Sequence, residues 1–328
     1  MSMNVTFRQL RLFLALAETG SVSAAARAMH VTQPTASMQL RDVSEAVGVP
    51  LYEVISRRVR LTEAGHDLAR TGRAMLGEWE SFTQRIDEMQ GLQRGRLSVS
   101  VVSTAKYFMP RLLGSFCQQH PQIDVSLQVL NRDGVVARLR DDRDDLYIMS
   151  APPLDIELDD RVFMANPLVL VAPASHPLSR RRRIELSELK AERFVLRERG
   201  SGTRIAVDAH FKRMRITPTV RLELGSNEAV REAVAAELGL SILSLHALGE
   251  RAAGHGLVVL PVRGFPIPSN WHIVQRRSRR RSPVAQAFEA HLVAHAAHAA
   301  ARDATQGTTK DTTQDTTRAA PQARRVTP

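Results

Sequence analysis

The chain has 328 residues, 43% of them hydrophobic and 24% charged, which is typical of a globular protein long enough for two or three domains. Its single cysteine excludes an intramolecular disulfide, and we find neither a signal peptide nor an apolar run of the ~20 residues that span a membrane, so we expect a cytoplasmic protein without a membrane partner. The net charge of +11 suggests nucleic acid as a partner, but residues 1–65 carry only seven arginines against five acidic residues, so DNA binding has to be argued from a motif.

The first predicted helix covers residues 6–18, where apolar side chains share one face, and Gly20 ends it. A second, short helix follows in the sequence AAARAM, and we expect Ser23 to cap it. Its alanines allow another helix to approach closely. Residues 30–31 form the predicted turn, after which Thr32 is expected to cap a third helix.

This third helix is expected to run to about Val47, with Pro34 in its first turn, where no backbone N–H has to be donated. Its apolar face points to the core and its polar face outward, which predicts a helix-turn-helix whose last helix enters the major groove, where Gln33 can bond adenine. The alternative is a plain three-helix packing unit. Residues 51–65 place two apolar pieces around basic residues and predict a wing. The expected DNA-binding residues are Thr32, Gln33, Pro34, Thr35, Ser37, Met38, Arg41, Arg57 and Arg58.

A long linker helix is predicted over residues 62–91. Its apolar residues are separated by 7, 4, 3, 4 and 3 positions, which is the spacing of a coiled-coil seam, with Gly72 at a weak position. The alternative is that this helix packs on its own domain. The expected dimerisation residues are Leu68, Met75, Trp79, Phe82, Ile86 and Met89.

Residues 95–300 alternate strand-like and helical runs, which predicts an α/β domain with a mainly parallel sheet. The expected strands are 97–102, 123–130, 145–149, 167–172, 194–196, 219–224, 240–243, 257–261 and 271–275, and the expected helices include 105–118, 131–140, 202–214 and 226–238.

Four segments, VSTAKY, NR, RERGSGTR and GSNEAV, follow strands and begin helices with hydroxyl or amide residues, and three of them carry cations. Helix capping explains each segment alone, but together they favour an anion-binding cleft at helix N-termini. The surplus of cations suggests a highly charged ligand such as a sugar phosphate. The expected effector-binding residues are Ser103, Thr104, Lys106, Arg132, Arg197, Ser201, Gly202, Thr203, Arg204, Ser226 and Asn227.

The N-terminal sequence FRQLRLFLALAETGSVSAAARAMHVTQPTAS, with LTEAG at 61–65, resembles the DNA-binding domain of LysR-type transcriptional regulators. STAKYFMPRLL, LRERGSGTR and LGSNEAVREAV are similar to the RuBisCO-operon, or Calvin-cycle, subgroup, and the similarity covers about residues 5–295. The sequence departs from the family at Val54, where arginine is usual, and in LYIMSAPP, where the subgroup tends to have LAIMGRPP.

The resemblance implies an all-α winged helix-turn-helix domain at 1–65, a dimerising linker helix at 62–91 and a periplasmic-binding-protein-like effector domain at 95–300. Two subdomains would make up this effector domain, residues 95–164 with 269–300 and residues 165–268. It further implies an activator of carbon-fixation genes whose partners are promoter DNA, a small anionic metabolite, RNA polymerase and further copies of the chain in a homodimer or homotetramer.

Two other functions fit an anion-binding cleft: an enzyme for a phosphorylated metabolite, or a binding protein without DNA activity. Against an enzyme, we find in the sequence no metal-ligand cluster, no nucleophile with a base and no Walker-type loop, so we expect no catalysis, no cofactor and no metal. Three histidines near residues 291–298 are better explained by solvent exposure than by metal binding. Residues 303–328 lack apolar periodicity and are predicted to be disordered.

Overall fold

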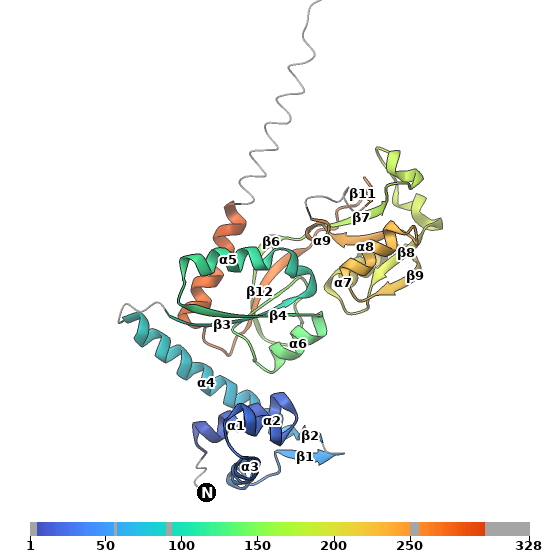
Figure 1. Cartoon of the computed structure of the whole chain (residues 1–328). Coiled ribbons are helices and arrows are strands. Elements are labelled where there is room, and N and C mark those ends of the chain that lie inside the picture. The colour runs from blue at the N-terminus through green and yellow to red at the C-terminus, as the bar shows by residue number, and fades with distance from the viewer. Residues whose placement is uncertain (1–4, 56–57, 90–93, 250–255, 299–328) are drawn as a thin grey trace, which may run out of the picture.

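The computed structural model describes residues 5–55, 58–89, 94–249 and 256–298 (Figure 1). A helical N-terminal unit is joined through the long helix α4 to a larger α/β part (Figure 1). Within these described ranges, no helix combines the length and the apolar character needed to cross a lipid bilayer. The predicted disordered tail, residues 303–328, lies outside the described residues.

The N-terminal unit packs helices against an antiparallel wing. Gly20 adopts the left-handed conformation and ends α1, as predicted. The predicted cap of α2 was wrong: Ser21 is extended and its hydroxyl accepts from the backbone N–H of Ala24, whereas Ser23 already lies inside the helix. The elements are α1 (Phe7–Thr19), α2 (Val22–Ala28), α3 (Gln33–Val47), β1 (Tyr52–Ile55) and β2 (Arg58–Leu61).

Helix α4 (Glu63–Met89) approaches the N-terminal unit closely at two glycines. A Cβ atom on Gly65 would lie 1.9 Å from the carbonyl oxygen of Leu51, and one on Gly72 would lie 2.8 Å from the side chain of Leu10. Gly72 is therefore a contact point with α1. Leu68 also packs against the core of the N-terminal unit. The first half of α4 thus belongs to this unit.

Subdomain I, defined by the strands below, is built on a mixed sheet in the order β4-β3-β5-β12-β6. β3 pairs in parallel with β4 and β5, but β12 runs antiparallel to β5 and β6. The predicted mainly parallel sheet was wrong, because the chain returns from subdomain II as β12 in the opposite direction. β6 was not predicted from the sequence, because three charged residues, Asp159, Asp160 and Arg161, follow its first residue. The elements are β3 (Gly95–Val102), η1 (Ser103–Tyr107), α5 (Met109–Gln119), β4 (Ile123–Leu130), α6 (Arg132–Arg140), β5 (Leu146–Met149), β6 (Leu158–Ala165), β12 (Asn270–Arg276) and a helix over residues 283–298.

Subdomain II centres on β7, which pairs antiparallel with β10 and β11. β8 pairs in parallel with β9, and an isolated parallel bridge from Phe194 to Leu240 connects β8 to β10. All residues of β7 and β10 are buried, which accounts for the continuous apolar run of β7. The elements are β7 (Leu168–Pro173), η2 (Pro177–Arg180), η3 (Leu186–Ala191), β8 (Arg193–Arg197), α7 (Gly202–Arg213), β9 (Thr219–Leu224), α8 (Asn227–Ala235), β10 (Ser241–Ser244), α9 (Leu245–Leu248) and β11 (Leu257–Val259).

The connections between the subdomains run side by side after β6 and before β12. The backbone N–H of Asn166 donates to the carbonyl oxygen of Ser269 at 2.8 Å, and Leu168 and Ile267 exchange backbone hydrogen bonds of 3.0 and 2.8 Å. The buried Asn166 side chain also accepts from the hydroxyl of Ser244 at 2.6 Å. The crossover is therefore a paired, ordered junction.

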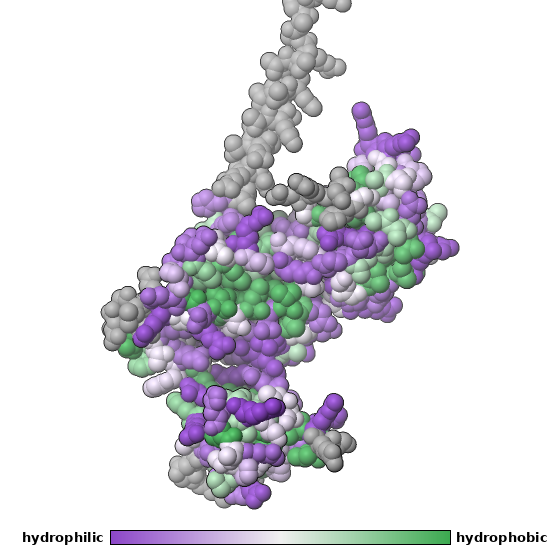
Figure 2. Space-filling model, viewed as in Figure 1, coloured by the Kyte–Doolittle hydropathy of each residue, from purple (hydrophilic) through white to green (hydrophobic). Residues whose placement is uncertain are grey.

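Apolar side chains remain on the surface of both subdomains. Figure 2 shows a hydrophobic area over subdomain I, between α5 and β4, within a largely hydrophilic surface. The edge strand β4 exposes Val129, and the edge strand β9 of subdomain II exposes Val220 and Leu222.

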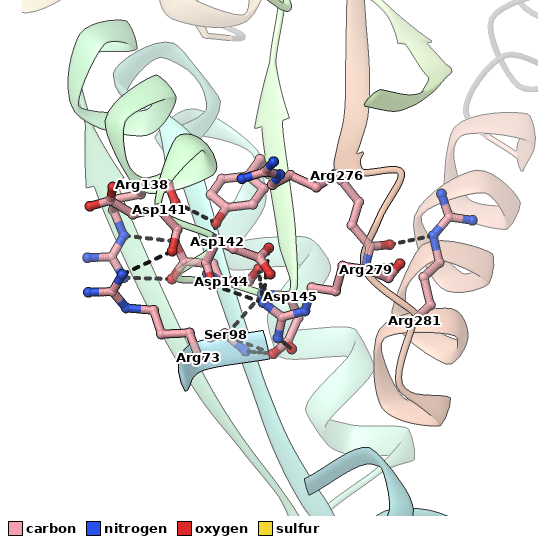
Figure 3. A network of polar contacts seen from close by, with 12 residues as sticks. Arg73, Ser98, Arg138, Asp141, Asp142, Asp144, Asp145, Arg276, Arg279 and Arg281 are labelled. Atoms are coloured by element: carbon pink, nitrogen blue, oxygen red, sulfur yellow. Dashed lines mark hydrogen bonds and ion pairs between the residues drawn. The ribbon is translucent and has the colours of Figure 1, made fainter. Parts of the chain in front are cut away.

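The loop at residues 141–145, between α6 and β5, places carboxylates beside arginines at the end of subdomain I that faces α4 (Figure 3). Arg279 donates to Asp145 Oδ1 at 2.7 Å and to the carbonyl oxygen of Asp144 at 3.0 Å. Arg138 forms two hydrogen bonds of 2.7 Å with the Asp144 carboxylate. These charge-assisted bonds fix the shape of the loop.

Helix α4 contacts this acidic loop directly (Figure 3). Arg73 in α4 donates from Nη1 to the carbonyl oxygen of Asp141 at 3.1 Å. A Cβ atom on Gly77 would lie 3.5 Å from Nη2 of Arg279, so the guanidinium passes close to the α4 backbone. A cavity of about 540 Å³ lies between α4 and subdomain I. Helix α6 ends at the acidic loop and begins with Arg132, which binds the loop after β5. This helix therefore runs between the acidic loop and the junction with subdomain II.

We predict that Arg279→Met destabilises subdomain I, because Asp142 and Asp145 would remain largely buried without their cation. Removing one partner of a buried ion pair costs about 3 kcal/mol. The exposed Arg280 offers a matched control as Arg280→Met. Thermal unfolding of the full chain should show a lower Tm for the first variant only. Equal Tm values for the two variants would contradict the assigned role of Arg279.

Candidate DNA-binding surface and effector cleft

Helix α3 presents a polar outer face at one end of the molecule. Thr32 caps it, because its hydroxyl accepts from the backbone N–H of Thr35 at 3.4 Å, and Pro34 lies in the first turn, as predicted. Among the predicted DNA-binding residues, the exposed ones are Thr32, Gln33, Pro34, Met38, Arg41 and the wing residue Arg58, and the half-buried ones are Thr35 and Ser37. Arg57 lies outside the described residues. DNA contact by this set stays a prediction.

Ser23, which was not predicted as part of this surface, lies beside Gln33. Its hydroxyl donates to Oε1 of Gln33 at 2.9 Å, across the contact between α2 and α3. The buried Ala25 and Ala26 of α2 have small side chains, which lets the two helices approach. The run of alanines indicated that another helix approaches α2 closely, but it did not identify the hydrogen bond between Ser23 and Gln33.

The second half of α4 exposes the predicted seam. Met75, Trp79, Phe82 and Ile86 are 50, 48, 44 and 37% exposed. The ring of Trp79 lies 5.8 Å from that of Phe7 and 5.7 Å from that of Phe82, so the stripe extends onto α1. The side chain of Met89 lies outside the described part of the chain. That this exposed stripe forms the dimer contact stays a prediction.

Arg197, at the end of β8, is the centre of the polar contacts between the subdomains. Arg197 is only 3% exposed, and its guanidinium donates to Asn227 Oδ1 at 2.6 Å. Asn227 in turn donates from Nδ2 to the hydroxyl of Thr104 at 3.0 Å. Arg197 also donates to the hydroxyl of Ser103 at 3.4 Å. Predicted residues from both subdomains therefore meet in one network.

The charges of two predicted cations are compensated within subdomain II. Arg197 forms hydrogen bonds of 2.7 and 2.9 Å with the adjacent Glu198. Arg204 is bound by Asp208 and Glu223 and also donates to the carbonyl oxygen of Arg197. Burial tends to lower the pKa of Arg204, but the hydrogen bonds and charges of these two carboxylates outweigh burial and raise that pKa. Arg204 thus holds the loop after β8 in place.

Lys106 and Tyr107 in subdomain I both bind Glu228 in subdomain II. The ammonium of Lys106 lies 2.9 Å from Glu228 Oε1, and the Tyr107 hydroxyl donates to the same oxygen at 2.6 Å. Burial tends to raise the pKa of Glu228, but the hydrogen bonds from Tyr107 and Lys106 outweigh it and lower the pKa to about 2. Burial and the hydrogen bond to Glu228 raise the pKa of Tyr107. This contact crosses the cleft beside the Arg197 network.

The third contact between the subdomains joins the start of α7 to the end of β5. A Cβ atom on Gly202 would lie 2.5 Å from the hydroxyl oxygen of Ser150, so a larger residue would displace the Ser150 side chain. Arg132 holds the adjacent loop by donating from Nε to the carbonyl oxygen of Ala151 at 2.8 Å. Ser201 caps α7 and Ser226 caps α8, each by accepting a backbone N–H. Thr203 is buried in the first turn of α7.

This pairing changes the expected chemistry of the cleft. Lys106, Arg197 and Arg204 each pair with a carboxylate that was not predicted for the site, so part of the predicted positive charge is compensated within the protein, and contact of these cations with an anion stays a prediction. Arg197 and Arg204 are buried, and a buried cation needs such a partner to offset its desolvation. What remains for a ligand is hydroxyl groups, helix N-termini and the charge of Arg132, which together suit a small anion. In the described residues, no group of three or more His, Cys, Asp or Glu side chains is arranged to hold a metal ion.

Both halves of the chain match known protein families. Residues 7–66 match the family model "Bacterial regulatory helix-turn-helix protein, lysR family", and residues 90–297 match "LysR substrate binding domain". The chain is 42% identical over 291 residues to the HTH-type transcriptional activator CmpR of Synechocystis sp., covering 89% of this chain and 96% of the relative. It is 41% identical over 291 residues to the RuBisCO operon transcriptional regulator of Acidithiobacillus ferrooxidans, covering 89% and 94%.

A solved structure resembles the effector half. The regulatory domain of Synechocystis PCC6803 CcmR in complex with 2-PG is 43% identical, with a TM-score of 0.60, and the match covers 62% of this chain and 98% of that one.

We predict that the contribution of Glu228 to stability depends on pH. Its pKa is lowered from 4.5 to about 2, so its stabilising effect is complete above 4.5 and is lost as the pH falls towards 2. Glu228→Gln should therefore lower the Tm at neutral pH, and its difference from the unsubstituted chain should shrink in acid. Glu232→Gln on the exposed face of α8 is the control. A difference in Tm that does not change with pH would contradict the ion pair.

We predict that Trp79→Asp combined with Phe82→Asp yields monomers in analytical ultracentrifugation. The two charges would lie in an exposed apolar stripe that the spacing assigns to a helix–helix contact. Ala74→Asp, on an exposed position outside the stripe, serves as the control and should leave the assembly intact. Dimers that persist in the double variant would place the interface elsewhere.

Proposed function

The chain belongs to the LysR family of DNA-binding transcriptional regulators, and from this premise we propose that it controls carbon-fixation genes in response to a small phosphorylated anion such as 2-PG. Its relatives include an activator and a RuBisCO operon regulator, which supports both the gene class and activation. The related CcmR regulatory domain has been solved with 2-PG. The proposed place of action is the cytoplasm, with promoter DNA and RNA polymerase as partners.

The observation that carries the effector proposal is the orientation of two hydroxyl groups. Thr104 Oγ1 accepts from Asn227, and Ser103 Oγ accepts from Arg197, so each hydroxyl keeps its own proton as a donor. An anion between the subdomains would receive these protons. Arg197 and Asn227 thus act by fixing the donors, and need not touch the ligand.

The proposed ligand contacts are fewer than the sequence suggested. They comprise Ser103, Thr104, Arg132, Ser201, Gly202, Thr203 and Ser226. Lys106, Arg197, Arg204 and Asn227 have supporting roles, because their polar groups are held by the contacts described above. With the charge of Arg132 and the helix N-termini as the positive groups, a compact phosphorylated carboxylate fits better than a ligand with several phosphates.

The DNA-binding part of the proposal follows from α3 and α4. A dimer through α4 would present two α3 helices to half-sites about 34–36 Å, or a multiple, apart. The operator should then be an interrupted palindrome. A change in the angle between the subdomains would reach α4 through the acidic loop, since Arg73 binds Asp141.

Calorimetric titration with 2-PG, phosphoenolpyruvate and ribulose bisphosphate tests the effector proposal. We expect a small phosphorylated carboxylate to bind best, and Thr104→Val to weaken binding about 10- to 100-fold through loss of a hydrogen bond to a charged group. Thr219→Val, at an exposed position of β9, should bind as the unsubstituted chain does. The same ligand should change the retardation of promoter DNA without being consumed. Binding of none of the three, or normal binding by Thr104→Val, would overturn the proposal.

A further inference from the structure

We propose that Ser23 is a specificity-determining residue for DNA recognition, because it fixes which end of the Gln33 amide faces the groove. This inference rests on the proposed role of α3 as the recognition helix. Ser23 is exposed on α2, and its hydroxyl donates to Gln33 Oε1 at 2.9 Å. The cap of α2 is Ser21, so Ser23 is not required to begin the helix.

The position of Ser23 is set by the packing of the two helices. α2 contributes the fully buried Ala25 and the nearly buried Ala26 to the core, and α3 contributes Ala36, which is also fully buried. These small residues bring the start of α2 against the start of α3. Gln33 is the first residue of α3, and its side chain is exposed. The hydrogen bond therefore lies at the end of α3 that would enter the major groove first.

The bond has a direct consequence for base recognition. A glutamine amide has an oxygen that accepts and an NH₂ group that donates, and rotation by half a turn exchanges them. With Oε1 held on the side of α2, the Gln33 NH₂ group points away from α2 and presents two donors. Donors match the acceptors of the major groove, such as N7 of a purine, O6 of guanine and O4 of thymine. Ser23 would therefore select bases by holding the amide in one of its two orientations.

A second role for Ser23 would be a contact with a DNA phosphate, since the first helix of this motif crosses the backbone. The two roles predict different results. A phosphate contact contributes equally to all sequences and acts independently of Gln33. An orienting bond contributes only at the base that Gln33 reads, and only while Gln33 is present.

A double-mutant cycle on the full-length protein separates these roles. Operator DNA is first selected from a random-sequence library with the unsubstituted protein, and affinities are then measured for all four bases at each position of the half-site. Ser23→Ala should lower discrimination at one position by about 2- to 10-fold, the effect of one hydrogen bond. Ser23→Thr retains a hydroxyl and should therefore discriminate between bases as the unsubstituted protein does. Alanine suits the helix interior, so folding of α2 is preserved.

The decisive comparison is between Gln33→Ala and the Ser23→Ala, Gln33→Ala double variant. If Ser23 acts through Gln33, the two bind every operator alike, and the effect of Ser23→Ala vanishes in the absence of Gln33. A further uniform loss in the double variant would show a phosphate contact and overturn the inference. Normal discrimination by Ser23→Ala would also overturn it. If Gln33→Ala itself binds and discriminates normally, it is the assignment of Gln33 to the DNA interface that fails.

Discussion

A guanidinium group that leaves water needs a carboxylate beside it, and this requirement organises both ends of the effector domain. At the junction of the subdomains, Glu198 compensates Arg197. At the end that faces α4, Asp142 and Asp145 compensate Arg279. Because the charges cancel locally, these arginines can serve as rigid hydrogen-bond donors to neutral groups. The hydroxyl groups of the cleft and the backbone of the acidic loop are both positioned in this way.

The features that could be predicted from sequence depend on neighbours along the chain. Thr32, Pro34 and Gly20 begin or end helices through contacts within a few residues, so their identity was sufficient. The exposed stripe from Met75 to Ile86 follows from helical periodicity alone. The positions of the cleft segments followed from a general property of α/β domains, in which strand ends and helix starts converge.

The features that could not be predicted depend on which distant residues meet. Lys106 pairs with Glu228 of α8, and Arg204 pairs with Glu223 of β9, and the order of residues along the chain does not reveal these two pairs. The direction of β12 depends on the path of the chain through subdomain II. Ser21 and Ser23 are both plausible caps by residue type, and only the backbone of the turn distinguishes them.

Helix α6 has 9 residues and joins Arg132, at the cleft, to Asp141, which meets α4. At a rise of ~1.5 Å per residue it spans about 14 Å, and one inserted residue would turn its two ends by about 100° relative to each other. Such an insertion would change the direction in which Arg132 faces the loop after β5 relative to the acidic loop, even if every side chain were kept. The length of α6, and not only its composition, therefore sets how these two loops face each other.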